Sequence, residues 1–293
     1  MKGSLVIVVT GANGAFGGLV VEQLLARIPA SDLAVSVRDT VGAARIACRG
    51  VDVRHGDFDR PETLPKAFAG ADTVLINGTN YGAAPQVRAR QQAAALQAAQ
   101  AVGATRIVIT SWQDLDNCPL ETVSDFPETE SLVAASGASW TVLRLTYGMS
   151  ASLARDVQSA LTVGTLAAPA GGARATPAAV GDLADATANV LSGIGHDGKT
   201  YELTGPDAIT WDDLATLATT LAGKEIGYRP VPDEEFRDQV LATGFSAPVI
   251  DMLVAYYQAF RAGWASTPSP DLGHLLRRQP TASLDAVRQA VAL

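Results

Sequence analysis

The chain has 293 residues, of which 47% are hydrophobic and 18% charged, with a formal net charge of −8. This composition is typical of a folded α/β protein of one or two domains and excludes a largely disordered chain. The negative charge and the absence of a Lys/Arg cluster disfavour nucleic acids and membranes as partners, because both present negative charge.

The cysteines and histidines indicate neither a disulfide framework nor a metal site. Cys48 and Cys118 lie far apart and match no metal or redox spacing, and the three histidines are not spaced as metal ligands. No apolar run is long enough for a membrane span, and the N-terminal run Leu5–Val9 is too short for a signal peptide. We therefore expect a cytoplasmic protein without a metal.

Short apolar, β-branched runs alternate with helical stretches through the first two-thirds of the chain. Six of these runs are expected as strands: Leu5–Val9, Leu33–Val37, Val51–Val53, Thr73–Ile76, Arg106–Thr110 and Trp140–Leu145. Continuous apolar runs of this length fit strands that are buried on both faces of a parallel sheet. The alternation predicts an α/β fold with a doubly wound parallel sheet and right-handed crossovers.

Helix signals separate these strands. The first helix follows the first strand and is closed by Pro29, and Asp59–Glu62 resembles a capping box with proline at the helix start. An Ala/Gln-rich stretch, Ala83–Val102, predicts a long helix before the fifth strand.

The rhythm changes after Leu145. Residues 164–177 are rich in Gly, Ala and Pro and are expected as a loop, 181–192 as a helix and 200–203 as a strand. Thr210 begins a capped helix that runs to about Leu221. The segment Val249–Phe260 has apolar residues at helical spacing, which favours a core helix. Alternatively it lines an apolar substrate pocket through Met252, Tyr256 or Tyr257.

A glycine pattern, Gly11-x-x-Gly14-x-x-Gly17, directly follows the first strand and opens the first helix. Gly11 permits the tight turn, Gly14 lets the backbone approach a pyrophosphate, and Gly17 lets the helix pack closely on the sheet. The helix N-terminus offers amide groups to the phosphates. We therefore predict a Rossmann-type fold that binds a nicotinamide dinucleotide, against the alternative of a ligand-free turn. The cofactor contacts predicted here are Gly11, Asn13, Gly14, Ala15, Phe16 and Gly17.

The end of the second strand distinguishes NADP(H) from NAD(H). Arg38 occupies the position where NAD enzymes place an acidic residue for the ribose hydroxyl. A guanidinium there can grip a 2′-phosphate, with Arg45 as a helper, so we predict NADP(H). NAD(H) is the alternative, because a small shift of the chain would place the Asp39 carboxylate at the ribose instead.

Further cofactor contacts are expected at the ends of the next strands, the edge where open α/β sheets bind ligands. Asp57 is expected to accept from the adenine amino group, and Phe58 to pack near the base. Asn77, Gly78 and Thr79 are expected along the ribose after the fourth strand, and Thr110 at the end of the fifth.

Two domains are expected. Residues 1–145, with 178–204 returning to them, form the NADP(H)-binding Rossmann domain. Residues 146–177 and 205–293 form a smaller, mostly helical substrate-binding domain.

These motifs together give a family resemblance that covers nearly the whole chain. It rests on Thr10–Gly17, Val37–Arg38, Gly56–Phe58, Pro85–Gln86, Arg106–Ser111, Glu128–Leu132, Ser136–Gly137, Leu143–Arg144, Asp182–Ala184, Tyr201–Pro206 and Trp211–Tyr228. The chain resembles the NmrA-like atypical short-chain dehydrogenase/reductase family, which includes quinone and triphenylmethane-dye reductases and redox-sensing regulators. The resemblance implies the Rossmann fold and NADP(H) binding and leaves the reaction open.

The usual proton donors of such enzymes are missing. Short-chain dehydrogenases carry a Tyr-x-x-x-Lys pair, which this chain lacks after the fifth strand. Many NmrA-like reductases have His or Lys four residues before the glutamate that Glu130 matches, and Phe126 stands there instead. A phenyl ring cannot exchange a proton.

Four residues are candidates for the substrate site. Ser111 matches the serine position of the broader superfamily and is expected to bond a substrate carbonyl. Tyr147 and Tyr81 could each present a phenol, and Trp112 could stack on a flat substrate. The alternative for each is a packing or loop role.

The leading hypothesis is an NADPH-dependent oxidoreductase that reduces a small aromatic, quinone-like or carbonyl compound. The alternatives are a non-catalytic NADP(H) redox sensor and a non-redox enzyme, such as a cyclase, isomerase or dehydratase, on the same fold. The expected partner is a small apolar or aromatic substrate, and a homodimer stays open.

Overall fold

The computed structural model describes residues 5–78 and 83–292, which fold into two compact units. Unit 1 comprises Met1–Trp112, Thr122–Leu145 and Leu183–Glu202, and unit 2 comprises Gln113–Glu121, Thr146–Asp182 and Leu203–Leu293. The short segment Gln113–Glu121 thus folds with unit 2, which the domain division expected from the sequence does not include.

A seven-stranded sheet forms the centre of unit 1, in the order β3-β2-β1-β4-β5-β6-β9. Its strands are β1 (Ile7–Thr10), β2 (Leu33–Val37), β3 (Asp52–His55), β4 (Thr73–Ile76), β5 (Arg106–Trp112), β6 (Ser139–Leu145) and β9 (Lys199–Leu203). Neighbouring strands from β3 to β6 pair in parallel. The doubly wound Rossmann-type sheet predicted from the sequence is confirmed.

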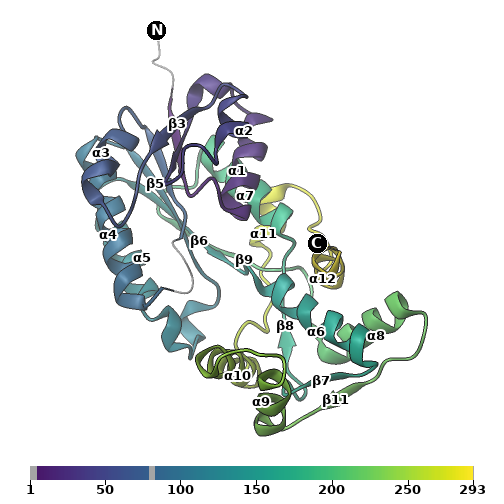
Figure 1. Ribbon diagram of the computed structural model, residues 1–293. Coiled ribbons are helices and arrows are strands. Elements are labelled where there is room, and N and C mark those ends of the chain that lie inside the picture. The colour runs from purple at the N-terminus through teal and green to yellow at the C-terminus, as the bar shows by residue number, and fades with distance from the viewer. Residues whose placement is uncertain (1–4, 79–82, 293) are drawn as a thin grey trace. The chain divides into compact units, whose positions relative to one another are not determined.

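Helices cover both faces of this sheet (Figure 1). They are α1 (Ala15–Leu25), α2 (Ala44–Ala47), α3 (Leu64–Ala67), α4 (Pro85–Ala101), α5 (Phe126–Ala134) and α7 (Val180–Ser192), of which α7 begins in unit 2. Strand residues such as Val8, Val74 and Ile107 pack in one buried cluster with Phe68 and Leu96 from the helical layer of α3 and α4. Burial on both faces explains why the strands are continuous apolar runs.

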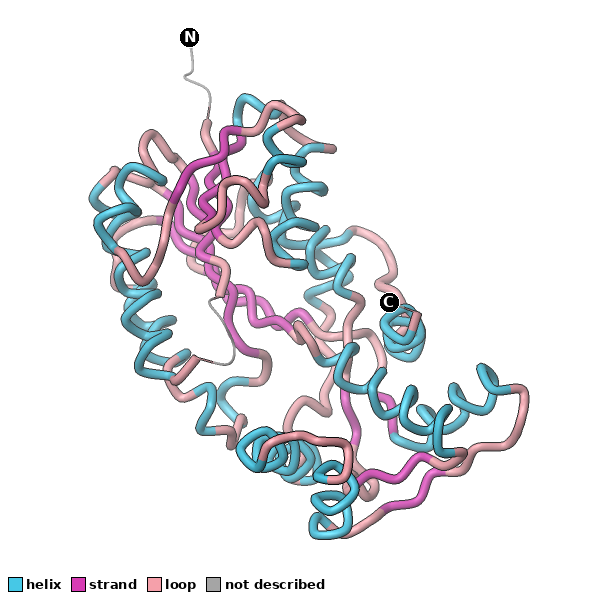
Figure 2. The backbone as a smooth tube through the Cα atoms, in the orientation of Figure 1, coloured by secondary structure: helices cyan, strands magenta, loops and turns pink. Residues whose placement is uncertain are grey.

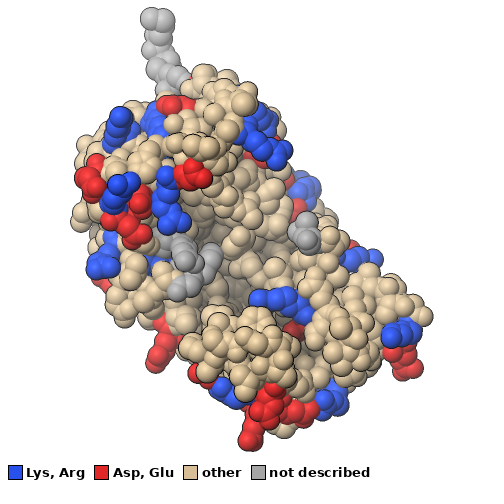
Figure 3. Space-filling view, in the orientation of Figure 1, with Lys and Arg blue, Asp and Glu red and all other residues tan. Residues whose placement is uncertain are grey.

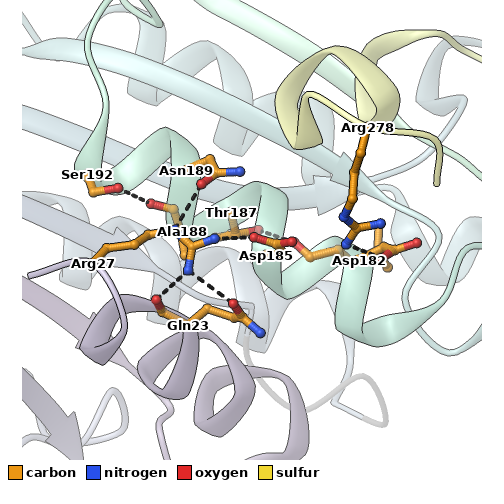
Figure 4. A network of polar contacts seen from close by, with 10 residues as sticks. Gln23, Arg27, Asp182, Asp185, Thr187, Ala188, Asn189, Ser192 and Arg278 are labelled. Carbon is orange, nitrogen blue, oxygen red and sulfur yellow. Dashed lines mark hydrogen bonds and ion pairs between the residues drawn. The ribbon is translucent and has the colours of Figure 1, made fainter. Parts of the chain in front are cut away.

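An arginine network joins α7 to the end of α1 on the other face (Figure 4). The Arg27 guanidinium donates to Asn189 Oδ1 at 2.9 Å and to Gln23 Oε1 at 3.0 Å, and it pairs with Asp185. Because these partners come from both helices, the network fixes the packing of α7 against α1.

Unit 2 is mostly helical, with two small sheets (Figure 2). Its helices are α6 (Met149–Val163), α8 (Trp211–Ala222), α9 (Asp233–Leu241), α10 (Ala247–Arg261), α11 (Asp271–Leu276) and α12 (Ser283–Val291). Strand β7 (Leu166–Ala168) pairs in parallel with β11 (Tyr228–Pro230), and β8 (Arg174–Ala175) pairs antiparallel with β10 (Ile209–Thr210). The predicted capping box at α8 is present, with Thr210 and Asp213 bonded reciprocally.

Two local predictions were wrong. Residues 164–177 are not only a loop, because they contain β7 and β8. No capping box forms at Asp59–Glu62: a 3₁₀ turn, Pro61–Thr63, begins there without a side-chain cap. The Asp59 backbone N–H instead donates to Asp57 Oδ1. A short acidic side chain such as that of Asp57 readily bonds the backbone two residues further on and so forms a turn.

Charged side chains on the face seen in Figure 3 are of both signs and are interspersed with large uncharged areas. No described helix is both long and apolar enough to cross a bilayer. Among the described residues, no three His, Cys, Asp or Glu side chains form a group that could hold a metal ion.

Candidate functional site

The turn between β1 and α1 leaves its backbone open. Gly11 has φ of +68°, a conformation that favours glycine, and its amide donates to the Ser36 carbonyl at 3.0 Å. Gly14 is the N-cap of α1, and no side chain caps the helix there. Gly11, Asn13, Gly14 and Ala15 are exposed. The turn therefore presents an exposed helix N-terminus without a side-chain cap, as an anion site requires.

Close packing requires glycine at position 17. A Cβ atom there would lie 2.4 Å from the Gly11 carbonyl oxygen and 2.9 Å from its carbon. Phe16 is 4% exposed and packs in the core, so only its backbone can contribute to the turn. The tight turn predicted from the glycine spacing is thus present, while the contacts with a cofactor stay predictions.

Polar groups converge at the carboxyl ends of β1, β4 and β5, next to this turn. The Asn77 amide donates to Thr10 Oγ1 at 2.9 Å, and the Gly78 amide to Thr110 Oγ1 at 2.7 Å. The Thr110 hydroxyl donates to Asn77 Oδ1 at 3.3 Å. These bonds hold the backbone that follows β4 against Gly11, whose added Cβ would meet Asn77 Nδ2 at 3.5 Å.

Arg38 and Asp39 follow β2 and behave differently. The Arg38 side chain is exposed and makes no hydrogen bond or ion pair with the residues that the structure describes. The Asp39 carboxylate accepts from the amides of Val41 and Gly42 at 2.9 and 3.0 Å, and the Asp39 carbonyl accepts from Asn13 Nδ2 at 2.7 Å. Asp39 is therefore engaged in its own turn, whereas the Arg38 guanidinium is available to an anion.

Asp57 and Phe58 follow β3, as expected. Asp57 Oδ1 accepts from the Asp59 amide at 3.0 Å, and its Oδ2 lies 3.6 Å from Arg60 Nε. Phe58 is half-buried and packs against the core cluster of the sheet. The predicted contacts of both residues with adenine are not tested by this arrangement.

Ser111, near the end of β5, belongs to a partly buried ionic network in unit 1. It is 2% exposed, and its hydroxyl donates to Glu130 Oε1 at 2.5 Å. Glu130 also accepts from Arg144 in a bidentate pair of 3.0 and 2.8 Å, and Arg144 reaches Glu202 at 3.0 Å. The Ser111 hydroxyl proton is thus held by a carboxylate, and its predicted contact with a substrate carbonyl stays a prediction.

The network was missed because its members are distant in sequence. One signal was present: Arg144 is a charged residue inside the apolar run of β6, and a charge that is largely removed from water needs a partner.

Phe126 begins α5 and is 2% exposed. The guanidinium carbon of Arg88 lies 5.5 Å from its ring centroid, and the ring of Trp112 is 6.2 Å away. Arg88 itself is fully buried, where it pairs with Asp125 and donates to the Ala83 carbonyl at 2.7 Å. Phe126 therefore fills a packed cluster of unit 1 and offers no group that could move a proton.

The structure does not show the remaining predicted site residues, Tyr81, Thr79 and Tyr147, together with Ser111 and Phe126. Tyr81 and Thr79 lie outside the described residues. Tyr147 belongs to unit 2, where it is half-buried, just before α6.

The helix α10 is a core element, as favoured for Val249–Phe260. Tyr257 is 7% exposed and donates to Asp156 at 2.7 Å, and Phe260 packs against Trp211 with ring centroids 5.5 Å apart. Met252, Tyr256 and Tyr257 were the alternative residues for lining a pocket. Tyr257 is buried in the core of unit 2, whereas Met252 is exposed and Tyr256 half-buried.

The chain is similar to NAD(P)H-binding proteins in sequence. A model of the NAD(P)H-binding family matches residues 11–191. Quinone oxidoreductase 2 of Escherichia coli is 32% identical over 282 residues, which are 96% of this chain and 97% of that protein.

Two solved structures are similar over nearly the whole chain. The Citrobacter sp. triphenylmethane reductase complexed with NADP(H) has a TM-score of 0.89 at 31% identity, covering 98% of this chain and 100% of that one. The NADPH-dependent quinone oxidoreductase of Escherichia coli complexed with NADPH has a TM-score of 0.90 at 30% identity, covering 97% and 99%.

Proposed function

The chain belongs to the NAD(P)H-binding family of oxidoreductases, and we propose that it is an NADPH-dependent reductase of a small quinone-like, aromatic or carbonyl compound. Its predicted place among the NmrA-like atypical short-chain reductases is confirmed, because an NmrA-like family domain-containing oxidoreductase of Aspergillus flavus is 28% identical over 289 residues, which are 96% of this chain and 93% of that protein. The observation that carries the proposal is the β1–α1 turn, where a helix N-terminus without a side-chain cap adjoins glycines that leave room for phosphates.

The residues after β2 support NADPH as the cofactor. The Arg38 guanidinium is exposed and unpaired within the described chain, and the Asp39 carboxylate is bonded to its own turn. A ribose 2′-phosphate could therefore pair with the Arg38 guanidinium. The Asp39 carboxylate, which could otherwise accept from a ribose 2′-hydroxyl, already accepts from backbone amides. Two similar structures contain NADP(H) or NADPH, which agrees with this choice.

The substrate class rests on the relatives and on the state of Ser111 and Phe126, neither of which offers a free proton. When bound, NADPH supplies a hydride. The Ser111 proton is held by Glu130, and Phe126 has none to give. A quinone needs no acid from the protein, because the oxygen that gains charge can take its proton from water. We infer that the chain's part is to bind and orient both molecules and to exclude side reactions.

Purified protein tests the proposal directly. We expect it to oxidise NADPH at 340 nm in the presence of small benzoquinones and naphthoquinones, with stoichiometric hydroquinone formation. NADH should serve at least tenfold less well in kcat/KM, because it lacks the phosphate that Arg38 would bind. Tight NADPH binding without turnover of any quinone, azo or triphenylmethane compound would contradict the reductase assignment.

A second candidate function is a redox sensor that binds NADP(H) without turnover. Phe126 favours it, because a phenyl ring stands where many relatives have a proton donor. A sensor must bind NADP⁺ and NADPH with different affinities, since only a difference can shift its conformation. Calorimetric titration with each nucleotide measures this. Equal affinities would exclude the sensor, and turnover of a quinone would make it unnecessary.

A further inference from the structure

A second arginine lies close to Arg38 at the carboxyl edge of the sheet in unit 1. Strands β2 and β3 pair in parallel with Val37 opposite His55, so the segments that follow both strands meet at one edge. His55 Nδ1 lies 3.1 Å from the Arg38 carbonyl oxygen, and Arg60 Nη2 lies 3.1 Å from His55 Nε2. The imidazole of His55 therefore connects the guanidinium of Arg60 to the backbone of Arg38.

The partners of His55 determine the state of its ring. A carbonyl oxygen can only accept, so Nδ1 carries the proton, and a guanidinium can only donate, so Nε2 presents its lone pair. The ring is thus a neutral acceptor for Arg60. A neutral acceptor orients the guanidinium without cancelling its charge, as a carboxylate would. His55 and Arg60 are both exposed, so this arrangement is accessible to a ligand from solvent.

The carboxylates around Arg60 are engaged with other groups. Asp57 Oδ2 lies 3.6 Å from Arg60 Nε, which is beyond hydrogen-bond length, and Asp57 Oδ1 accepts from the Asp59 amide at 3.0 Å. The Asp59 carboxylate accepts from Gln91 Nε2 at 2.7 Å. Among the described residues, the Arg60 guanidinium makes one hydrogen bond, to His55. Its other N–H groups are therefore open to an anion.

The charge at this edge favours a ligand with more than one negative charge. Arg38 and Arg45 are exposed, and neither makes a hydrogen bond or ion pair through its side chain with the residues that the structure describes. With Arg60 they supply three guanidinium groups on neighbouring segments of unit 1. A phosphate monoester carries a charge of about −1.5 to −2 at pH 7 and has three acceptor oxygens, which suits more than one guanidinium at once.

We propose that Arg60 is a second residue for the ribose 2′-phosphate of the cofactor, beside Arg38, and that His55 is the positioning residue that holds its guanidinium there. The inference rests on the proposed function and adds to it a determinant of cofactor choice. One guanidinium can bind two phosphate oxygens in a bidentate pair, which leaves the third oxygen for another. Because NADH lacks this phosphate, Arg60 would strengthen the binding of NADPH alone.

A pair of cofactor fragments tests Arg60 without the nicotinamide: ADP-ribose and the same molecule with a 2′-phosphate on its adenosine. We expect Arg60→Gln to raise the Kd of the 2′-phosphorylated fragment about 5- to 20-fold, as for one exposed charge-assisted contact. The Kd of ADP-ribose should stay within twofold. Arg49→Gln is the matched control, since it changes another exposed arginine of unit 1, one that precedes β3 and so lies toward the opposite edge of the sheet. It should alter neither Kd in calorimetric titration.

Two variants of His55 test its positioning role. His55→Phe removes the acceptor, so the 2′-phosphorylated fragment should bind more weakly, but by no more than in Arg60→Gln. His55→Gln keeps an acceptor oxygen at similar reach and should retain most of the affinity. The double variant of His55→Phe and Arg60→Gln should bind no more weakly than Arg60→Gln alone, because His55 acts through Arg60. A merely structural role of His55 would weaken ADP-ribose as well.

The outcomes separate this inference from the proposed function. A wild-type protein that binds both fragments equally, or neither, contradicts NADPH as the cofactor, whatever the variants do. If the wild type prefers the 2′-phosphorylated fragment and Arg60→Gln keeps that preference, the inference about Arg60 is overturned. Equal losses for both fragments also overturn it, and additive losses in the double variant overturn the role of His55. Should Arg60→Gln not fold, Arg60→Lys keeps the charge without the planar fork and should show a smaller loss of the same kind.

Discussion

Gly17 is the position in the β1–α1 turn that leaves the least room for a side chain. In Gly17→Ala the new Cβ would overlap the Gly11 carbonyl, so the turn must open. We expect the Kd for NADPH, measured by fluorescence titration, to rise at least about tenfold. Gly18→Ala is the control on the next residue, where a Cβ would lie 3.3 Å from the Ala12 carbonyl oxygen. If Gly17→Ala and Gly18→Ala bound NADPH equally well, the β1–α1 turn would not be the site that binds the phosphates.

We expect Arg38 to determine the choice between NADPH and NADH. Arg38→Gln removes the cation but keeps a side chain of similar reach, so NADPH should bind about 10- to 100-fold more weakly, as for a lost charge-assisted bond. The affinity for NADH should change less than threefold, since it has no 2′-phosphate. Arg49→Gln, which alters an exposed pair with Glu22, should change neither. Parallel losses for both nucleotides would place Arg38 elsewhere than at the phosphate.

At this scale the sequence predicts what local spacing determines. The glycine turn and the position of Arg38 follow from their distance to a strand end, and the structure places them there. The engagement of Asp39 was not predictable, because it depends on which amides of the following turn face the carboxylate.

At the scale of elements, one glutamate connects three of them. Glu130 of α5 bonds Ser111 of β5 and Arg144 of β6, and the side chains of the ion pair are 13–14% exposed. Glu130→Gln should lower the free energy of unfolding by about 2 kcal/mol, because a nearly buried guanidinium loses its bidentate partner. Urea denaturation measures this.

The exposed pair of Glu22 with Arg49 supplies the control for that measurement. Glu22→Gln breaks an ion pair whose side chains are 45–54% exposed, and it should cost about 0.5 kcal/mol or less. If both glutamine variants had the same small effect, the network around Glu130 would contribute no more than a surface ion pair.

Elements could be predicted where burial gives a sequence pattern. Leu33–Val37 and Thr73–Ile76 match β2 and β4 to the residue, since a strand buried on both faces is an uninterrupted apolar run. The short strands β7 and β8 were missed, because two or three residues show no periodicity. Their partners β11 and β10 are also distant in sequence, and pairing between distant segments has no local signal.

For the whole molecule, the regular alternation of strands and helices was enough to predict the doubly wound parallel sheet, although it did not give the strand order. The exact division into units was not predictable. Residues 113–121 join unit 2 through contacts of Gln113 and Asp114 with Trp264 and Ala265, which are 151 residues further along the chain.

A buried carboxyl group of unit 2, that of Asp156, couples the stability of the protein to pH. Asp156 accepts hydrogen bonds from Tyr257 at 2.7 Å and from Trp211 at 2.8 Å. Burial nevertheless raises the pKa of this carboxyl from 3.8 to about 6, because desolvation outweighs the two bonds. The folded protein therefore holds a proton between pH 4 and 6 that the unfolded chain releases. The contribution of Asp156 to stability is then largest below pH 4 and is lost as pH rises through 6.

The variant Asp156→Asn removes this titration but keeps an acceptor oxygen for both donors. Relative to the variant, the wild type should lose about 1–3 kcal/mol of unfolding free energy between pH 4 and 6.5, and the difference should be constant above pH 7. Asp233 provides a control of opposite sign, because its bond with Arg261 lowers the pKa of that carboxyl. The contribution of Asp233 is present at neutral pH and is lost on acidification, so Asp233→Asn should weaken the protein most at pH 7. A difference between wild type and Asp156→Asn that does not change with pH would show that Asp156 has the same pKa in the folded and unfolded states.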